Sequence, residues 1–117
     1  MEYLSTRDKT LRLSAAQAIK MGLSRDGGLF TPVHFPVLSA LEMETLCGMS
    51  YQRRAAYVMG KYLEDFRPEE LEAFAESAYG PEKFDHPGVA PLHRMDANTW
   101  CLELWHGPTS AFKDMAL

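Results

Sequence analysis

Four segments of the chain place apolar residues along one face of a helix. The longest follows Ser50 and repeats apolar side chains every three or four residues as far as Phe66, the spacing typical of an amphipathic helix. Two shorter segments begin at Ser14 and Ser39, each with Gln or Glu three residues later, and this capping-box spacing satisfies amide groups at a helix start. A fourth helix is predicted from Pro68, since proline suits the first helical turn. Its inner face is expected to carry Leu71, Phe74, Ala75, Ala78 and Tyr79.

Strand-forming residues are confined to short segments near the two ends of the chain. Tyr3–Leu4 and Leu29–Thr31 predict two brief strands, and Thr99–Trp105 predicts a third, because it is dense in strand formers and bounded by turn signals. The expected fold class is therefore α+β and mainly α, with a small helical N-terminal domain that carries a short sheet.

A connector divides this helical region from the last strand. Residues 84–91 contain two prolines and a glycine, a composition typical of a loop between elements. We therefore expect one domain over residues 1–92 and the start of a second over residues 93–117. In the second, a helix is predicted to begin at Thr109 or Ser110 and to continue to the end of the chain.

Composition and charge exclude several functional classes. The chain has 117 residues, 46% of them apolar, and its 12 basic and 16 acidic side chains give a net charge of −4. The absence of a basic stripe disfavours nucleic-acid binding. The longest uncharged run, Leu29–Leu41, is broken by two prolines, so no membrane span is predicted. Cys47 and Cys101 lie far apart, without metal-ligand spacing, and the N-terminus lacks an apolar signal core, so we expect a cytoplasmic protein that binds no metal.

The most informative segment is Leu102–Leu117, which has the pattern strand, tight turn, helix start. In α/β proteins such a turn lies at the carboxyl end of a strand, where ligands bind. Lys113 falls in the first helical turn, whose field, together with partial burial beside Ala111 and Phe112, would favour a neutral amine. Schiff-base chemistry needs a neutral amine. A solvated surface lysine is the commoner explanation for a lysine in this setting.

A resemblance favours the chemical interpretation. His106–Leu117 closely resembles the lysine motif of the threonine synthases, enzymes that depend on pyridoxal phosphate (PLP). Other segments resemble further signatures of that family in the same order, namely Tyr3–Arg7, Ser24–Pro32 and Val89–Leu92. The glycine that usually follows the Ser-Thr-Arg triplet is Asp8 here, and the common phenylalanine before the histidine is Trp105.

The resemblance implies a fold, a cofactor and a reaction. The second domain would begin a PLP-binding α/β domain like that of the tryptophan synthase β chain. Lys113 would carry PLP as an internal aldimine and shuttle protons, and Phe112 would wall the cofactor ring. The family converts O-phosphohomoserine and water to threonine and phosphate, in threonine biosynthesis. Ser5, Thr6 and Arg7 would face the substrate, although a strand end with a surface arginine explains this triplet equally well.

The sequence also predicts how the chain behaves alone. It stops in the first turn of its last predicted helix, so we expect a fragment. In the family the glycine-rich loop for the cofactor phosphate follows the lysine motif, so the fragment is expected to bind PLP weakly and to turn over nothing. The Trp100–Trp105 strand would have open edges, and apolar open edges pair with other chains. We therefore expect self-association through this C-terminal strand.

Two alternative functions stay open at this point. One is a related PLP-dependent phospho-lyase that acts on another phosphorylated amino acid, because the residues that choose between substrates are not in this segment. The other, from a different class, is a non-catalytic structural or interaction module.

Overall fold

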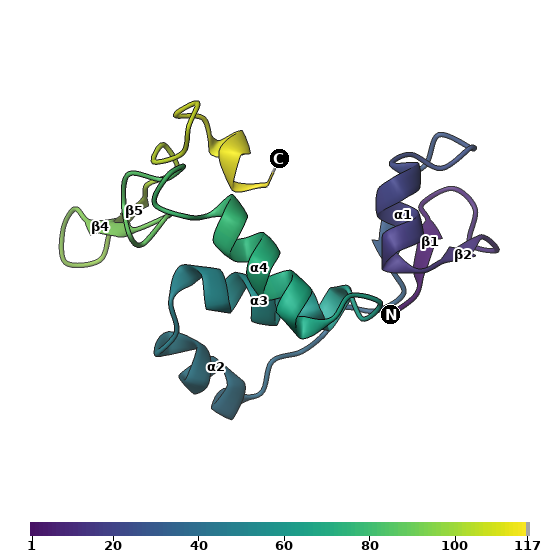
Figure 1. The fold of residues 1–117 in the computed structure, drawn as a ribbon, viewed down its shortest axis with the longest axis horizontal. Coiled ribbons are helices and arrows are strands. Elements are labelled where there is room, and N and C mark those ends of the chain that lie inside the picture. The colour runs from purple at the N-terminus through teal and green to yellow at the C-terminus, as the bar shows by residue number, and fades with distance from the viewer. Residues whose placement is uncertain (117) are drawn as a thin grey trace.

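Three helices, over residues 40–47, 51–62 and 68–78, lie between an N-terminal part, which holds a small sheet and the first helix, and a C-terminal pair of strands (Figure 1). The computed structural model describes residues 1–116. The helices are α1 (Ala15–Met21), α2 (Ala40–Cys47), α3 (Tyr51–Tyr62) and α4 (Pro68–Ala78), and η1 (Phe112–Met115) is a short 3-10 helix. The strands are β1 (Tyr3–Ser5), β2 (Arg12–Leu13), β3 (Phe30–Pro32), β4 (Leu92–Arg94) and β5 (Trp100–Leu102). None of the helices among the described residues is long and apolar enough to cross a membrane.

The four predicted helices are confirmed, and their starts lie where the caps predict them. Ser14 and Ser39 each accept a hydrogen bond from the third helical amide, and the side chain of that third residue accepts from the serine N–H. Ser50 caps α3 through its hydroxyl, and α4 begins at Pro68. Local capping chemistry therefore sets these helix starts, because it satisfies amides that have no partner within the helix.

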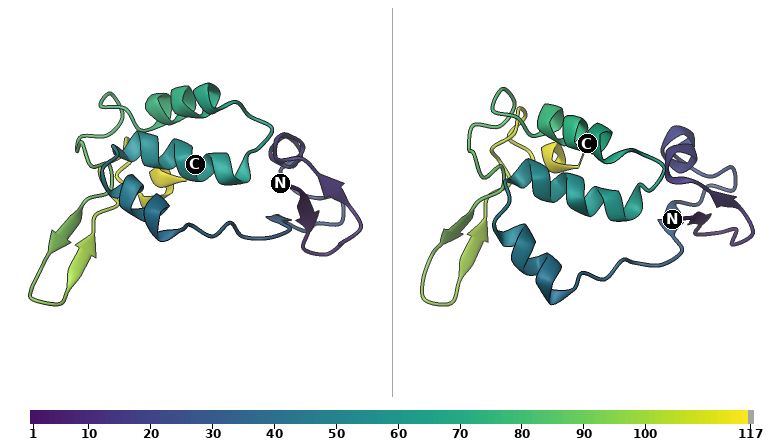
Figure 2. Two further views of the ribbon diagram at one scale, coloured as in Figure 1. Left: turned by 90° about the horizontal axis from the view of Figure 1, so that it is seen from below. Right: turned by 60° about the horizontal axis from the view of Figure 1, so that its bottom comes forward.

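The core lies where α3 and α4 pack side by side (Figure 2). Ala56, Leu71 and Ala75 are buried there. Partly buried side chains surround them, namely Ala55, Met59, Leu63, Phe66 and Tyr79. Small residues at the contact let the two helices approach closely, and the larger side chains close the sides of the interface.

Two details of the predicted helix faces are wrong. The apolar stripe continues to Phe66, but α3 ends at Tyr62, because Leu63 leaves helical geometry at φ −104° and ψ 57°. Phe66 still reaches the core from the loop between the helices. Phe74 and Ala78 were expected on the inner face of α4, but both are exposed, Phe74 by 54%, since the contact with α3 is narrower than the apolar stripe.

The three-stranded sheet has the order β2-β1-β3 and is antiparallel throughout. The sequence predicts β1 and β3 but not the two-residue strand β2. Two hydrogen bonds, together with an ion pair between the N-terminal amine and Glu64, join this end of the molecule to the end of α3 and the loop that follows it. The Tyr3 hydroxyl donates to the Tyr62 carbonyl at 3.1 Å, and the Ala16 N–H donates to Asp65 Oδ2 at 2.8 Å.

The C-terminal segment departs most from the prediction. The expected strand over Thr99–Trp105 is only the three residues of β5, and it pairs with β4, which the sequence does not predict. The expected final helix is the single 3-10 turn of η1, and neither Thr109 nor Ser110 caps it. Leu117, the last residue of that expected helix, lies outside the described residues. The fold class, α+β with four helices and short sheets, is confirmed.

The α3–α4 contact predicts a large difference between two identical substitutions. Leu71 is 3% exposed, and Leu41 on α2 is 73% exposed. Leu71→Ala should lower the free energy of unfolding by about 2–5 kcal/mol, because it leaves a cavity in the core. Leu41→Ala should change it by less than about 0.5 kcal/mol. Urea denaturation followed by circular dichroism measures both, and equal effects would contradict this account of the core.

Candidate functional site

The turn that carries Lys113 is shaped by the carboxylate of Asp114. Asp114 Oδ2 accepts from the Thr109 N–H at 2.8 Å, and Oδ1 accepts from the Thr109 hydroxyl at 2.6 Å. These hydrogen bonds lower the pKa of Asp114. A Cβ on Gly107 would lie 2.5 Å from the Asp114 Cβ, so only glycine fits there. Ser110 has a positive φ of 55°, a conformation that costs energy for a residue with a side chain.

A histidine clamped between two carboxylates fixes the other end of this segment. His106 Nδ1 lies 2.6 Å from Asp85 Oδ1, and its Nε2 lies 2.7 Å from Glu103 Oε2. The Asp85 N–H also donates to the His106 carbonyl at 3.1 Å. Glu103 first, and Asp85 second, raise the pKa of His106, because both stabilise the imidazolium. The clamp joins the connector after α4 to the start of the lysine segment.

Lys113 itself is exposed. The expectation of partial burial beside Ala111 and Phe112 is wrong, because the Phe112 ring is also 67% exposed and covers nothing. A four-residue 3-10 helix likewise does not provide the positive field of a full α-helix start. What the structure shows is a reachable amine on a turn that hydrogen bonds hold on both sides.

The Ser-Thr-Arg triplet forms a different cluster, around Asp26. Ser5 is buried, and its hydroxyl donates to the Asp26 carboxylate at 2.9 Å and accepts from the Arg7 N–H at 3.2 Å. Arg7 Nη1 donates to the Asp26 carbonyl at 3.1 Å, and Thr6 Oγ1 accepts from the Leu29 N–H at 3.0 Å. The first two sequence blocks of the predicted family signature are therefore joined in space.

A glycine makes this junction possible. A Cβ on Gly28 would lie 2.2 Å from Ser5 Oγ and 3.1 Å from the Arg7 backbone nitrogen. The Gly28 N–H donates to Asp26 Oδ1 at 2.8 Å and is the largest cause of the lowered pKa of Asp26. The turn can approach β1 this closely only because position 28 has no side chain.

Within this chain the triplet and Lys113 do not meet. Tyr3 of the sheet and Ala16 of α1 bond to Tyr62 and Asp65, just before α4, whereas η1 contacts Tyr79 just after α4. The 11 residues of α4 separate these two contact points by about 16 Å. Figure 1 shows η1 and β1 at opposite ends of α4.

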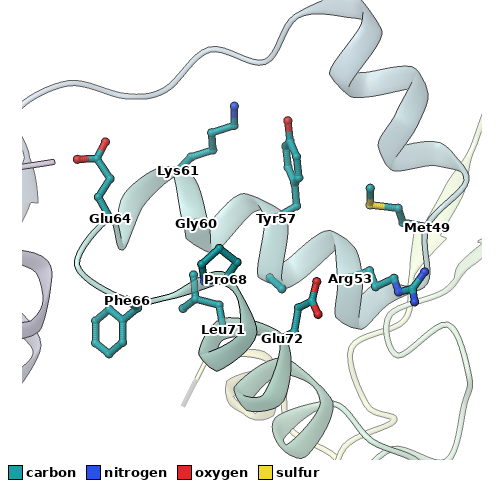
Figure 3. Close-up of a pocket in the computed structure, with 11 residues that line it drawn as sticks. Met49, Arg53, Tyr57, Gly60, Lys61, Glu64, Phe66, Pro68, Leu71 and Glu72 are labelled. Atoms are coloured by element: carbon teal, nitrogen blue, oxygen red, sulfur yellow. The ribbon is translucent and has the colours of Figure 1, made fainter.

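A hollow of about 660 Å³ lies along α3 and α4, away from both clusters (Figure 3). Met49, Phe66 and Leu71 give it apolar walls, and none of the site residues expected from the sequence lines it. Two of the residues that line it, Lys61 and Tyr57, donate hydrogen bonds to Glu42 of α2. These bonds hold the pKa of Glu42 far below its usual range and attach α2 to α3.

Sequence reasoning missed most of the residues that build these clusters. Asp26 has a detectable signal, since Asp before Gly-Gly is typical of a turn in which the carboxylate accepts backbone amides. Asp85 and Tyr79 have no such signal in the sequence. The partner of Asp85, His106, lies 21 residues away in the chain, and the partner of Tyr79, Met115, lies 36 residues away.

The fold is shared with enzymes of known structure, one of which has PLP bound. It superimposes on a PLP-bound threonine synthase from Brucella melitensis with a TM-score of 0.89 and 40% identity, covering 97% of this chain and 24% of that one. For the threonine synthase from yeast the TM-score is 0.88 at 32% identity, over 98% and 24% of the two chains.

Sequence comparisons identify the family. The family described as "Threonine synthase N terminus" matches residues 2–79. The threonine synthase of Pseudomonas aeruginosa is 37% identical over 118 residues, which covers all of this chain and 25% of that protein. That of Schizosaccharomyces pombe is also 37% identical, over all of this chain and 23% of that protein. The chain belongs to the threonine synthase N-terminal family, and it spans about a quarter of the length of these relatives.

The His106 clamp predicts a pH dependence. Because the folded-state pKa of His106 is raised, the stabilisation from the clamp is complete below the ordinary value of 6.5 and is lost as the pH rises through the folded-state value. The NMR titration midpoint of His106 should therefore lie above 6.5.

Two variants that replace a carboxylate by an uncharged amide test the cause of the raised pKa of His106. Glu103→Gln should lower the midpoint more than Asp85→Asn, since Glu103 makes the larger contribution. A midpoint at or below the ordinary histidine value in the unsubstituted chain would show that the clamp does not form.

Proposed function

We propose that the chain is the N-terminal portion of a threonine synthase, which converts O-phosphohomoserine and water to threonine and phosphate, with Lys113 as the lysine that holds PLP. One observation carries the proposal. Lys113 lies exposed on a turn shaped by Gly107 and Asp114, in a chain that follows a PLP-bound threonine synthase over 97% of its length.

The residues present fit the cofactor. An exposed lysine amine is open to an aldehyde in solution, and the neighbouring Phe112 ring is free of cover and can lie beside an aromatic cofactor. PLP, when bound, supplies the electron sink that stabilises a carbanion. In this proposal the Lys113 amine holds the cofactor and then moves protons between substrate atoms, as a general acid and base. Groups for the cofactor phosphate are expected outside this segment.

The substrate role of Ser5, Thr6 and Arg7 stays a prediction, and the three differ in what they offer. The Ser5 hydroxyl and Thr6 Oγ1 are engaged in hydrogen bonds that join β1 to the next turn. Arg7 is exposed and donates one hydrogen bond to the Asp26 carbonyl. Since a guanidinium has five N–H groups, Arg7 is the member of the triplet best suited to a phosphate.

We place the boundary between the two domains near residue 92. The last α-helix, α4, ends at Ala78, the connector over 84–91 contains no helix or strand, and β4 begins at Leu92.

A cytoplasmic location also stays part of the proposal. Both cysteines are free thiols, as expected in a reducing compartment.

A chimaera tests the proposed function. We would replace the matching first quarter of the Pseudomonas aeruginosa threonine synthase with this chain and measure phosphate and threonine from O-phosphohomoserine. The chimaera should be active, and Lys113→Ala should lower kcat by at least about 10³-fold, because the reaction loses its covalent and proton-transferring group. Lys83→Ala, at another exposed lysine, serves as the control.

Further results of the same activity measurements distinguish the proposed function from its alternatives. The chain alone should form no threonine, and detectable turnover would contradict that expectation. Full activity of the Lys113→Ala chimaera would refute the assigned role of the lysine. Faster release of phosphate from another phosphorylated amino acid would favour the related phospho-lyase.

We also propose that the chain self-associates through the β4–β5 pair. Among residues 1–116 neither strand pairs with a third, and two strands alone are marginally stable in water. Leu92, Trp100 and Leu102 are 51–62% exposed, and the register places them on one face. Open edges beside an apolar face favour pairing with a second chain.

Sedimentation velocity tests this association. The weight-average mass should rise with concentration, and Leu102→Lys should suppress the rise because it places a charge in the contact. Leu41→Lys introduces the same charge at an exposed leucine of α2 and should have no effect. A monomer at the highest attainable concentration would refute the proposal.

A further inference from the structure

We propose that Tyr79 is a positioning residue for Lys113. The Tyr79 hydroxyl donates a hydrogen bond to the Met115 carbonyl at 2.9 Å, two residues beyond the lysine. Tyr79 is also the last residue that matches the N-terminal family. The bond therefore links the helical N-terminal domain to the turn that carries the lysine. This inference rests on the role proposed above for Lys113.

The Tyr79 ring contacts two other aromatic rings, and hydrogen bonds hold its backbone. Its centroid lies 5.1 Å from that of Tyr51, in an edge-to-face arrangement, and 5.8 Å from that of Phe84. Its carbonyl accepts from Gln52 Nε2 at 2.7 Å, and its N–H donates to the Ala75 carbonyl at 2.9 Å. A phenol held this firmly can fix the position of the carbonyl to which it donates.

The lysine turn, by contrast, has little to hold it internally. η1 has four residues, no buried side chain and no side-chain cap. Its own backbone bonds run from the Asp114 N–H to the Ala111 carbonyl and from the Ala116 N–H to the Lys113 carbonyl, both at 3.0 Å. One turn of 3-10 helix is not stable by itself in water, so its order must come from contacts outside it.

Two hydrogen-bonded anchors supply that order, one at each end. Asp114 binds Thr109 on the N-terminal side, so this anchor lies within the same segment. On the C-terminal side the Tyr79 hydroxyl reaches Met115 from the end of α4. A hollow of about 430 Å³ beside this bond is lined by Ala78 and Phe84 and by Asp114 and Met115 of η1. Side-chain packing between η1 and the end of α4 is therefore incomplete. The hydrogen bond from the Tyr79 hydroxyl determines how firmly the backbone around Lys113 is held.

Amide hydrogen exchange of Tyr79→Phe tests the inference in the chain itself. The variant removes the hydroxyl and keeps the ring that packs on Tyr51 and Phe84. Exchange over residues 110–116 should become about fivefold faster, as expected for the loss of one hydrogen bond, whereas α3 should be unchanged. Tyr51→Phe is the matched control, since it alters the same ring pair but not the bond to Met115.

Reductive trapping adds a readout at the lysine. With PLP and borohydride, the fraction of label at Lys113 relative to Lys83 should fall in Tyr79→Phe and not in Tyr51→Phe. No label at Lys113 in any variant, together with the expected exchange result, would count against the proposed function and leave the positioning role supported.

Three results would overturn the positioning role. The first is equal exchange over 110–116 in Tyr79→Phe and the unsubstituted chain, and the second is an equal effect of Tyr51→Phe. A general loss of stability in Tyr79→Phe would also accelerate exchange in α3.

In that case urea is added to the unsubstituted chain until its stability equals that of the variant, and exchange over residues 110–116 is compared again. Faster exchange in the variant supports the positioning role. Equal exchange in the two chains is the third result that overturns it.

Discussion

The contact between α3 and α4 is the feature on which the other parts of the structure depend. Leu71 and Ala75 of α4 pack against Ala56 of α3, and this is the main interface between helices in the molecule. The N-terminal sheet is hydrogen-bonded to the last residue of α3, and η1 is hydrogen-bonded to Tyr79 at the end of α4. Burial of these few side chains therefore fixes the frame in which both polar clusters lie.

Carboxylates organise the irregular segments, where apolar packing is sparse. Asp26 gathers the turn after α1 onto β1, Asp114 folds the segment before η1, and Asp85 with Glu103 holds His106. Each accepts bonds from backbone amides or from a second polar side chain, and such bonds stabilise a single loop conformation where few apolar contacts exist. The positions of Gly28 and Gly107 follow from the same carboxylates, because each glycine lies where a side chain would collide with such a cluster.

The segment that carries Lys113 is held by polar contacts and not by the apolar core. Lys113 is exposed and lies on a turn with a strained residue at Ser110, and strained backbone persists only where the surroundings determine it. The order of the turn comes from polar contacts at its two ends rather than from burial. Such a segment leaves one face open to a ligand while its backbone stays fixed, which suits the cofactor attachment proposed for Lys113.

The sequence by itself determined the four helices, their caps at Ser14, Ser39 and Ser50, and the family, because capping, helical periodicity and motif order are local properties of the chain. It failed for the extent of the last strand and for the final helix, where tertiary hydrogen bonds override local propensity. Only the tertiary structure decided that Ser5 faces Asp26 rather than the lysine, and that Tyr79 reaches the lysine turn. Those pairs lie far apart in the chain, and their contact depends on how the helices pack.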